Sequence, residues 1–243
     1  VYTYTNVGDY SYASSPSKFT SYVVYQEGIY VGYKFYETAA AEGLIDYDKT
    51  VVYPFGRGLS YTTFTQTLNS VTEADGTITV DVTVTNTGSA SGKEVVEVYY
   101  NPPYTNGGIE KASANLIGFA KTSELAPGAS ENVTVTFKAE DMASYDTYGK
   151  GCYVLEKGDY VISINADSHT VLDSKVYNVA SDIVYDASNK RESDVEVADN
   201  KFDFAEGNVT YLSRADGFAN YAEATAAPAD FELPAQAKAT FYN

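Results

Sequence analysis

The nine residues from Thr77 to Thr85 alternate strictly between polar and apolar side chains. Isoleucine and valine occupy every second position, and threonine or aspartate stands between them. A period of two places the apolar side chains on one face of an extended chain, which predicts a β-strand with one buried face. Asp75-Gly76, directly before it, is typical of a tight hairpin turn, so the strand is expected to pair with an earlier one at residues 64–71. The chain must therefore build an antiparallel sheet around this hairpin.

The same alternation recurs between residues 59 and 180, with turn signals between the runs. Further strands are predicted at residues 94–100, 132–137, 160–164 and 174–179. Pro102-Pro103 ends the first of these, because proline donates no ladder hydrogen bond, and Pro127-Gly128 marks a turn before the second. About seven short antiparallel strands joined by such turns predict a mainly β fold, a sandwich of the immunoglobulin or fibronectin type III kind.

The N-terminal flank, residues 1–58, has a different pattern. Its apolar side chains from Gly28 to Ala41 suit a helix, and Gly43 is a typical helix stop, so an N-terminal helical flank is predicted. Four aromatic side chains lie on this stretch, namely Tyr30, Tyr33, Phe35 and Tyr36. Because one short helix cannot bury them, we expect a partner surface, and self-association through residues 20–64 where that surface is absent.

The C-terminal flank, residues 181–243, carries 12 acidic and 5 basic side chains. It is nearly all polar from Asn189 to Asn200 and rich in alanine and proline after Ala222. Such a composition buries little apolar surface of its own, which predicts a long acidic connector laid over a surface.

Charge and composition exclude several classes of protein. The net charge of −17 excludes a nucleic-acid binder, because phosphates would repel it. Cys152, the only cysteine, allows no disulfide framework and is interpreted as a small buried hydrophobic residue. With His169 the only histidine and no phosphate or calcium loop, neither a metal nor a cofactor is expected. The sequence has no apolar run of about 18 residues and no signal-peptide pattern, and it leaves a cytoplasmic, secreted or bacterial cell-surface location open.

Two sequence blocks carry a family resemblance. They are YQEGIYVGYKFYE at residues 25–37 and YPFGRGLSYTTF at residues 53–64. In this order and spacing, and followed at once by a predicted sandwich, they closely resemble glycoside hydrolase family 3 β-glucosidases. The resemblance is to the segment that ends their second catalytic domain and enters a fibronectin III-like domain. Lys34 stands where that family usually has arginine, which removes a bidentate partner for a carboxylate.

The sandwich and the connector extend the resemblance. Four further blocks are similar to the family's fibronectin III-like domain: Ile109-Glu110-Lys111, residues 116–121, residues 125–128 and residues 156–160. Residues 209–216 are similar to the connector of members with reversed domain order, in which the fibronectin III-like domain precedes a (β/α)-barrel. Gly217 departs from that pattern, since an aromatic residue is expected after Asp216.

The resemblance implies three parts of the chain. Residues 1–58 would be the C-terminal part of an α/β sandwich domain, residues 59–180 the fibronectin III-like sandwich, and residues 181–243 the acidic connector toward the barrel. The implied partners are the missing α/β and barrel domains of a parent chain and its carbohydrate substrate. The implied parent reaction is hydrolysis of terminal β-D-glucosyl residues with retention.

No catalytic residue is expected in this chain. Retaining hydrolysis needs a carboxylate nucleophile and a carboxylic acid about 5 Å apart. The resemblance places the first on the barrel and the second upstream of the Pro-Phe-Gly block, both outside these 243 residues. Ser181-Asp182 and Ser193-Asp194 lie in the acidic connector, and His169 lies in a turn between two predicted strands, where a surface position is expected. The chain alone is therefore predicted to be inactive.

Four side chains are weaker candidates for the rim of the parent's sugar cleft, namely Glu27, Arg57, Arg214 and Asp216. Glu27 is interpreted first as compensating the N-terminal charge of the following helix. Arg57 lies between two glycines that permit positive φ, which favours a turn between packed layers.

The favoured function is structural, that of a segment bracing the catalytic domains of a family-3-like β-glucosidase. A second class stays open at this point, an extracellular bacterial surface or filament subunit for adhesion or assembly. A carbohydrate-binding module would need an exposed aromatic platform, which periodicity alone cannot establish. The residues also do not encode which glycoside the parent cleaves.

Overall fold

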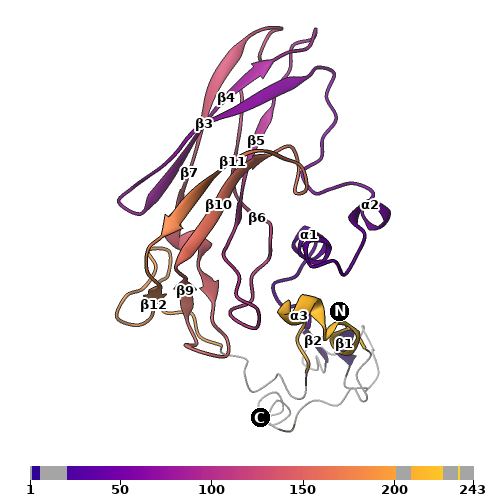
Figure 1. Cartoon of the computed structure of the whole chain (residues 1–243), viewed down its shortest axis with the longest axis vertical. Coiled ribbons are helices and arrows are strands. Elements are labelled where there is room, and N and C mark those ends of the chain that lie inside the picture. Colours follow the sequence, from indigo (N-terminus) through magenta and orange to yellow (C-terminus); the bar gives the residue numbers. More distant parts are fainter. Residues whose placement is uncertain (1, 6–20, 201–208, 227–234, 236–243) are drawn as a thin grey trace, which may run out of the picture.

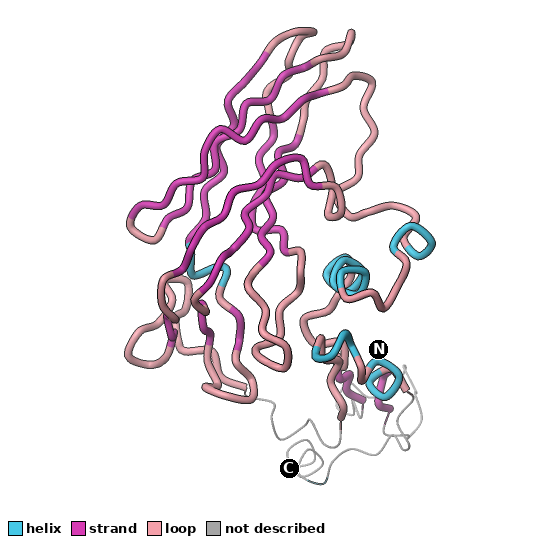
Figure 2. The backbone as a smooth tube through the Cα atoms, viewed as in Figure 1, coloured by secondary structure: helices cyan, strands magenta, loops and turns pink. Residues whose placement is uncertain are grey.

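The computed structural model describes residues 2–5, 21–200, 209–226 and 235, and two antiparallel sheets dominate it. One sheet has the order β3 (Phe64–Ala74), β4 (Thr77–Asn86), β7 (Ser130–Lys138). The other has the order β11 (Val171–Val179), β10 (Gly158–Asn165), β5 (Val95–Asn101), β6 (Asn115–Lys121). The strands run along the long axis of the molecule, and the helices lie beside one end of the sandwich (Figures 1 and 2). The predicted mainly β sandwich is confirmed.

The β3–β4 hairpin forms as the sequence predicts. Asp75 and Gly76 both have positive φ, 50° and 73°, which matches the right-handed twist of the two strands they join. Along β4 the even positions are fully buried and the odd positions are half-buried. β4 also pairs with β7 from Thr77 to Thr85, so it is the central strand of the three-stranded sheet.

Both sheets contribute to one hydrophobic core. Its fully buried side chains include Ile78, Val80, Val82, Val84, Val96, Val98, Tyr160, Ile162 and Ile164. Tyr160 satisfies its buried hydroxyl by donating to the Glu156 carbonyl oxygen at 3.1 Å, and burial raises the pKa of this phenol. Cys152 is a buried free thiol, as predicted. Close packing of this kind makes the sandwich a rigid support for the loops at its ends.

A small third sheet lies at one end of the sandwich (Figure 1). Its order is β12 (Ile183–Tyr185), β9 (Tyr153–Leu155), β8 (Ser144–Tyr145), and a 3-10 turn, η1 (Ala139–Met142), leads into it. Arg191 then packs its guanidinium 3.6 Å over the Tyr153 ring and binds both Asp194 carboxylate oxygens at 2.8 Å. The first part of the C-terminal flank is thus tied to the sandwich.

The helical flank begins later than predicted. β1 (Tyr2–Thr5) pairs with β2 (Ser21–Val24), and α1 (Tyr33–Ala41) and α2 (Tyr47–Thr50) follow. Gly28 and Gly32 have positive φ, and the Gly28 and Tyr30 amides close tight turns on the Tyr25 and Glu27 carbonyls at 2.9 Å. The helix expected from Gly28 therefore starts only at Tyr33. It ends before Gly43 as predicted, where φ is 76°.

Two short helices complete the described chain, α3 (Ala215–Phe218) and α4 (Tyr221–Ala224). They lie next to α1 rather than continuing away from the sandwich (Figure 1). Among the described residues, no helix has the length and apolar character needed to cross a bilayer.

The face assignment of β4 can be tested by stability. Val82→Ala should lower the free energy of unfolding by roughly 1–3 kcal/mol, because it removes fully buried methyl groups. Thr83→Ser on the other face should cost less than about 0.5 kcal/mol, since the serine hydroxyl can keep the bonds to Asn69 and Asn132. Urea unfolding monitored by circular dichroism measures both variants. Equal costs would contradict the assignment.

Candidate functional site

The carboxylate of Glu110, in the loop between β5 and β6, joins three distant parts of the chain. It accepts hydrogen bonds from the Tyr30 hydroxyl, the Ser213 hydroxyl and, at 3.0 Å, the Arg214 amide. Tyr30 precedes α1, whereas Ser213 and Arg214 belong to the segment expected to connect toward another domain. We call these four residues the clasp. It fastens the helical flank and the connector to one loop of the sandwich.

The Arg214 side chain has partners of its own next to the clasp. Its Nε donates to Glu42 Oε1 at 2.6 Å, and one terminal nitrogen donates to the Lys111 carbonyl oxygen at 2.9 Å. The guanidinium also lies 4.2 Å from the centre of the Tyr104 ring. Only 11% of the Arg214 side chain is exposed. The structure thus places this candidate residue inside the junction, with its charge neutralised by Glu42.

Asp216 lies at the outer edge of the clasp. It exchanges two hydrogen bonds with Asn106: the Asn106 amide donates to the Asp216 carboxylate at 2.7 Å, and the Asp216 backbone donates back at 2.8 Å. Asp216, Gly217 and Phe218 all have positive φ, between 53° and 69°, which is costly for the two non-glycine residues, Asp216 and Phe218. The turn delivers Phe218 inward, so the connector supplies a buried aromatic ring one position after Gly217.

Phe218 completes a small second core. Its ring meets Tyr30 edge-on at 5.0 Å and Phe35 at 6.0 Å. The other buried members are Ala39, Ala112, Leu212 and Ala224. Burial and the neighbouring Glu110 carboxylate raise the pKa of Tyr30, so its hydroxyl stays protonated and remains a donor. Part of the aromatic surface of the helical flank is therefore covered by the connector.

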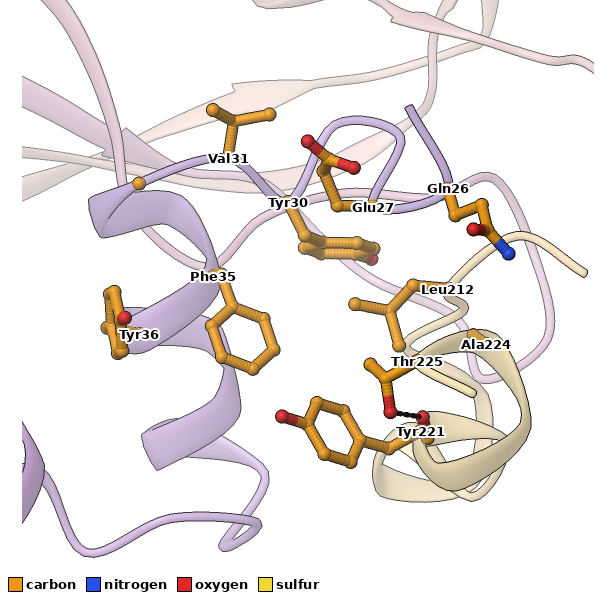
Figure 3. A pocket seen from close by; sticks show the side chains of 11 residues that line it. Gln26, Glu27, Tyr30, Val31, Phe35, Tyr36, Leu212, Tyr221, Ala224 and Thr225 are labelled. Carbon is orange, nitrogen blue, oxygen red and sulfur yellow. Dashed lines mark hydrogen bonds between the residues drawn. The ribbon is translucent and has the colours of Figure 1, made fainter. Parts of the chain in front are cut away.

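A cavity of about 520 Å³ opens beside the clasp (Figure 3). Its aromatic walls include Phe35 and Tyr221, whose rings stack at 5.9 Å, together with Tyr30 and Tyr36. Glu27 also lines it. Glu27 lies in the turns before α1 and not in the first helical turn, so its interpretation as a helix charge partner is wrong. The cavity wall spans the helical flank and the connector, as Figure 3 shows.

A second junction holds α1 to the turn between β10 and β11. The buried Glu37 carboxylate accepts from the Tyr47 hydroxyl at 2.6 Å, the Ser168 hydroxyl at 2.7 Å and the His169 Nδ1 at 2.8 Å. The His169 ring stacks on Tyr47 with centroids 3.7 Å apart. His169 lies exposed in the turn between β10 and β11, as predicted, and it also takes part in this junction. Sequence reasoning did not identify Glu37.

Arg57 lies apart from the clasp, in the loop between α2 and β3. Its guanidinium is exposed, 5.1 Å from the Tyr53 ring centre. Next to it, Gly56 has a φ of 88° and faces Glu97 so closely that a Cβ would lie 2.4 Å from a carboxylate oxygen. Gly58 does not use positive φ, so the predicted glycine requirement holds at Gly56 only. Tyr33 stacks on Phe55 at 4.7 Å and fixes the middle of this loop.

The chemistry of both junctions is structural. The Glu110 and Glu37 carboxylates are each occupied by three donors from this chain, and Glu42 neutralises Arg214. Charge-assisted hydrogen bonds of this kind are strong and hold the joined segments together. Within the described ranges, no group of three metal-ligating side chains gathers.

Comparison with known proteins fits this architecture. The Fibronectin type III-like domain family matches residues 94–168. Beta-glucosidase A of Butyrivibrio fibrisolvens is 43% identical over 157 residues, which cover 57% of this chain and 18% of the relative. The β-glucosidase of Kluyveromyces marxianus is 34% identical over 164 residues, which cover 67% of this chain and 18% of the relative.

Solved structures show the same relationship. β-Glucosidase 3B from Thermotoga neapolitana, in complex with glucose, matches with a TM-score of 0.58 and 36% identity over 67% of this chain and 21% of that one. The family 3 β-glucosidase of Bifidobacterium adolescentis matches with a TM-score of 0.54 and 31% identity over 64% of this chain and 21% of that one. The chain carries a fibronectin type III-like domain and is similar to one segment of family 3 β-glucosidases. It spans about a fifth of the length of the β-glucosidases it matches.

The clasp can be tested in this chain. Glu110→Ala should leave the buried Tyr30 hydroxyl without its acceptor and lower the opening free energy of residues 209–226 by roughly 1–3 kcal/mol. Hydrogen exchange of those amides measures it. Glu124→Ala removes the same charge from an exposed position and serves as the control. Equal exchange in the two variants would show that the clasp does not hold the connector.

Glu97 gives a prediction about pH. Its partial burial, reinforced by Asp167 and Glu94, raises the pKa of its carboxyl above the ordinary 4.5. At pH values between the unfolded-state pKa and the higher folded-state pKa, the unfolded chain has already lost the proton that the folded chain keeps. The free energy of unfolding therefore falls as pH rises through this range. Glu97→Gln removes this dependence. The stability of the variant relative to the unsubstituted chain should therefore be higher at pH 7 than at pH 4. Urea midpoints at both pH values measure the gain, with Glu124→Gln as the control, and a constant difference would contradict the prediction.

Proposed function

We propose that this chain is a structural, domain-bracing segment of a β-glucosidase that hydrolyses terminal β-D-glucosyl residues by a retaining mechanism. The observation that carries the proposal is the clasp: one carboxylate of the sandwich binds donors from the helical flank and from the connector. If residues 1–58 end an α/β domain and residues 181–243 lead toward a barrel, the clasp fixes the path of the chain between the two catalytic domains.

A brace of this kind matters for catalysis because the reacting groups sit on different domains. The family resemblance puts the nucleophile on the barrel and the acid/base residue on the α/β domain. These groups act on one glycosidic bond only when they are held about 5 Å apart. A misplacement of about 1 Å is enough to slow such chemistry strongly. The proposed contribution of this segment is therefore positional.

The four rim candidates take different places in this proposal. Glu27 and the exposed Asp216 lie on the clasp side, Glu27 in the wall of the cavity, and Arg57 lies on the loop before β3. We assign Arg214 to positioning, because its guanidinium is occupied by Glu42 and Lys111. The partners of the segment would be the α/β and barrel domains of the parent, and its carbohydrate substrate where the rim reaches the cleft.

The bacterial surface or filament subunit is not favoured. The matched proteins are β-glucosidases in both comparisons, with identities from 29% to 43%. The helical flank and the connector also pack onto the same end of the sandwich, which suits a segment inside a longer chain.

Two activity measurements test the proposal. Residues 1–243 alone should hydrolyse an aryl β-glucoside no faster than buffer, because the family resemblance places both catalytic carboxylates outside these residues. The complete β-glucosidase carrying Glu110→Ala should inactivate faster on heating than the Glu124→Ala control, with KM unchanged within about twofold. Turnover by the isolated chain that disappears on changing one of its own carboxylates would overturn the proposal.

A further inference from the structure

The loop from Val51 to Thr63, between α2 and β3, carries an unusual row of exposed apolar side chains. Leu59 and Tyr61 are 95% and 101% exposed, and Val52 and Tyr53 are 78% and 73% exposed. Single exposed apolar residues are ordinary, but several along one short loop mark an interaction surface. Figures 1 and 2 show this loop running from α2 past the end of the sandwich to the start of β3.

The loop has a defined position. Phe55 stacks on Tyr33, and its carbonyl oxygen accepts a hydrogen bond from the Ser168 amide at 2.8 Å. Gly56 lies against the Glu97 carboxylate. The loop is therefore anchored at its middle to α1, to the turn between β10 and β11 and to β5, while exposed side chains lie on either side of the anchor.

The charge of the loop differs from that of the chain. The 243 residues include 33 acidic side chains, but none lies between Val51 and Thr63, where Arg57 is the only charged residue. Two copies of a chain with net charge −17 repel each other, which disfavours a second copy as the occupant. An apolar partner surface with a carboxylate opposite Arg57 fits both the exposed side chains and the charge.

We propose that the loop Val51–Thr63 is the docking surface for the remainder of the parent β-glucosidase chain. This rests on the proposed function, in that it assumes such a parent. The matched β-glucosidases are about five times as long as the part this chain covers, so most of a parent's mass lies outside it. In the assembled protein, Leu59 and Tyr61 pack into an apolar surface of another domain, and Arg57 pairs with a carboxylate there.

Hydroxyl-radical footprinting of the complete β-glucosidase and of residues 1–243 tests the proposal. Oxidation of Leu59 and Tyr61 should be at least about fivefold slower in the complete protein. Tyr148, also strongly exposed, serves as the internal control and should react equally in both. Equal oxidation of Leu59 in the two proteins would overturn the proposal. Protection that fades on dilution of the complete protein would also overturn it, because the occupant would then be a second copy.

A pair of variants separates this inference from the brace itself. Leu59→Ser with Tyr61→Ser should leave the melting temperature of residues 1–243 unchanged, since neither side chain is buried there, and should speed heat inactivation of the complete enzyme. Phe119→Ser, at an exposed position on β6, is the control. If Glu110→Ala weakens the complete enzyme and the loop pair does not, the docking inference fails while the brace stands.

Discussion

The arrangement of this segment depends on one partly buried carboxylate. Glu110 is stabilised as an acceptor by three donors, and two of them come from the connector. The loop that presents it is itself held by the buried Lys111, whose ammonium binds the Pro103 carbonyl oxygen at 2.7 Å and the Glu156 carboxylate. Burying an ionic group is costly because water is removed from it, so such contacts add little net stability. The clasp therefore selects one path for the chain more than it strengthens the fold.

The helix α1 illustrates why such contacts are needed. With nine residues it is too short to be stable alone in water. Glu37 fixes one side of it to the turn between β10 and β11, and Thr38 accepts a hydrogen bond from the Ser113 amide at 2.9 Å. Tyr30 fixes the chain just before it. The helix is thus stabilised by tertiary contacts. These contacts join it to loops of the same sandwich that carries Glu110.

The difference between what the sequence predicts and what it misses has a physical basis. The strands follow from local alternation, which needs only neighbouring residues, and β4 lies where its pattern places it. The junctions join residues far apart, 80 positions for Tyr30 and Glu110 and 172 for Glu42 and Arg214, so no local pattern predicts them. Arg214 and Asp216 were found through the family resemblance, and Glu110 lay in a matched block without an assigned role. The late start of α1 did have a signal in Gly28 and Gly32, which the helical spacing of the apolar residues concealed.

The tyrosines show how the same side chain serves both structure and docking. Tyr30, Tyr33, Tyr47 and Tyr99 take part in hydrogen bonds within the chain, and burial raises the pKa of each, so they remain neutral. Tyr53 and Tyr61, on the loop before β3, are exposed instead. An aromatic ring with a polar tip tolerates either environment, which lets a loop rich in tyrosine stay soluble before it is covered. Tyr53 and Tyr61 flank Phe55, which stacks on Tyr33, so the stacking holds the loop in place while the two tyrosines on either side stay uncovered by this chain.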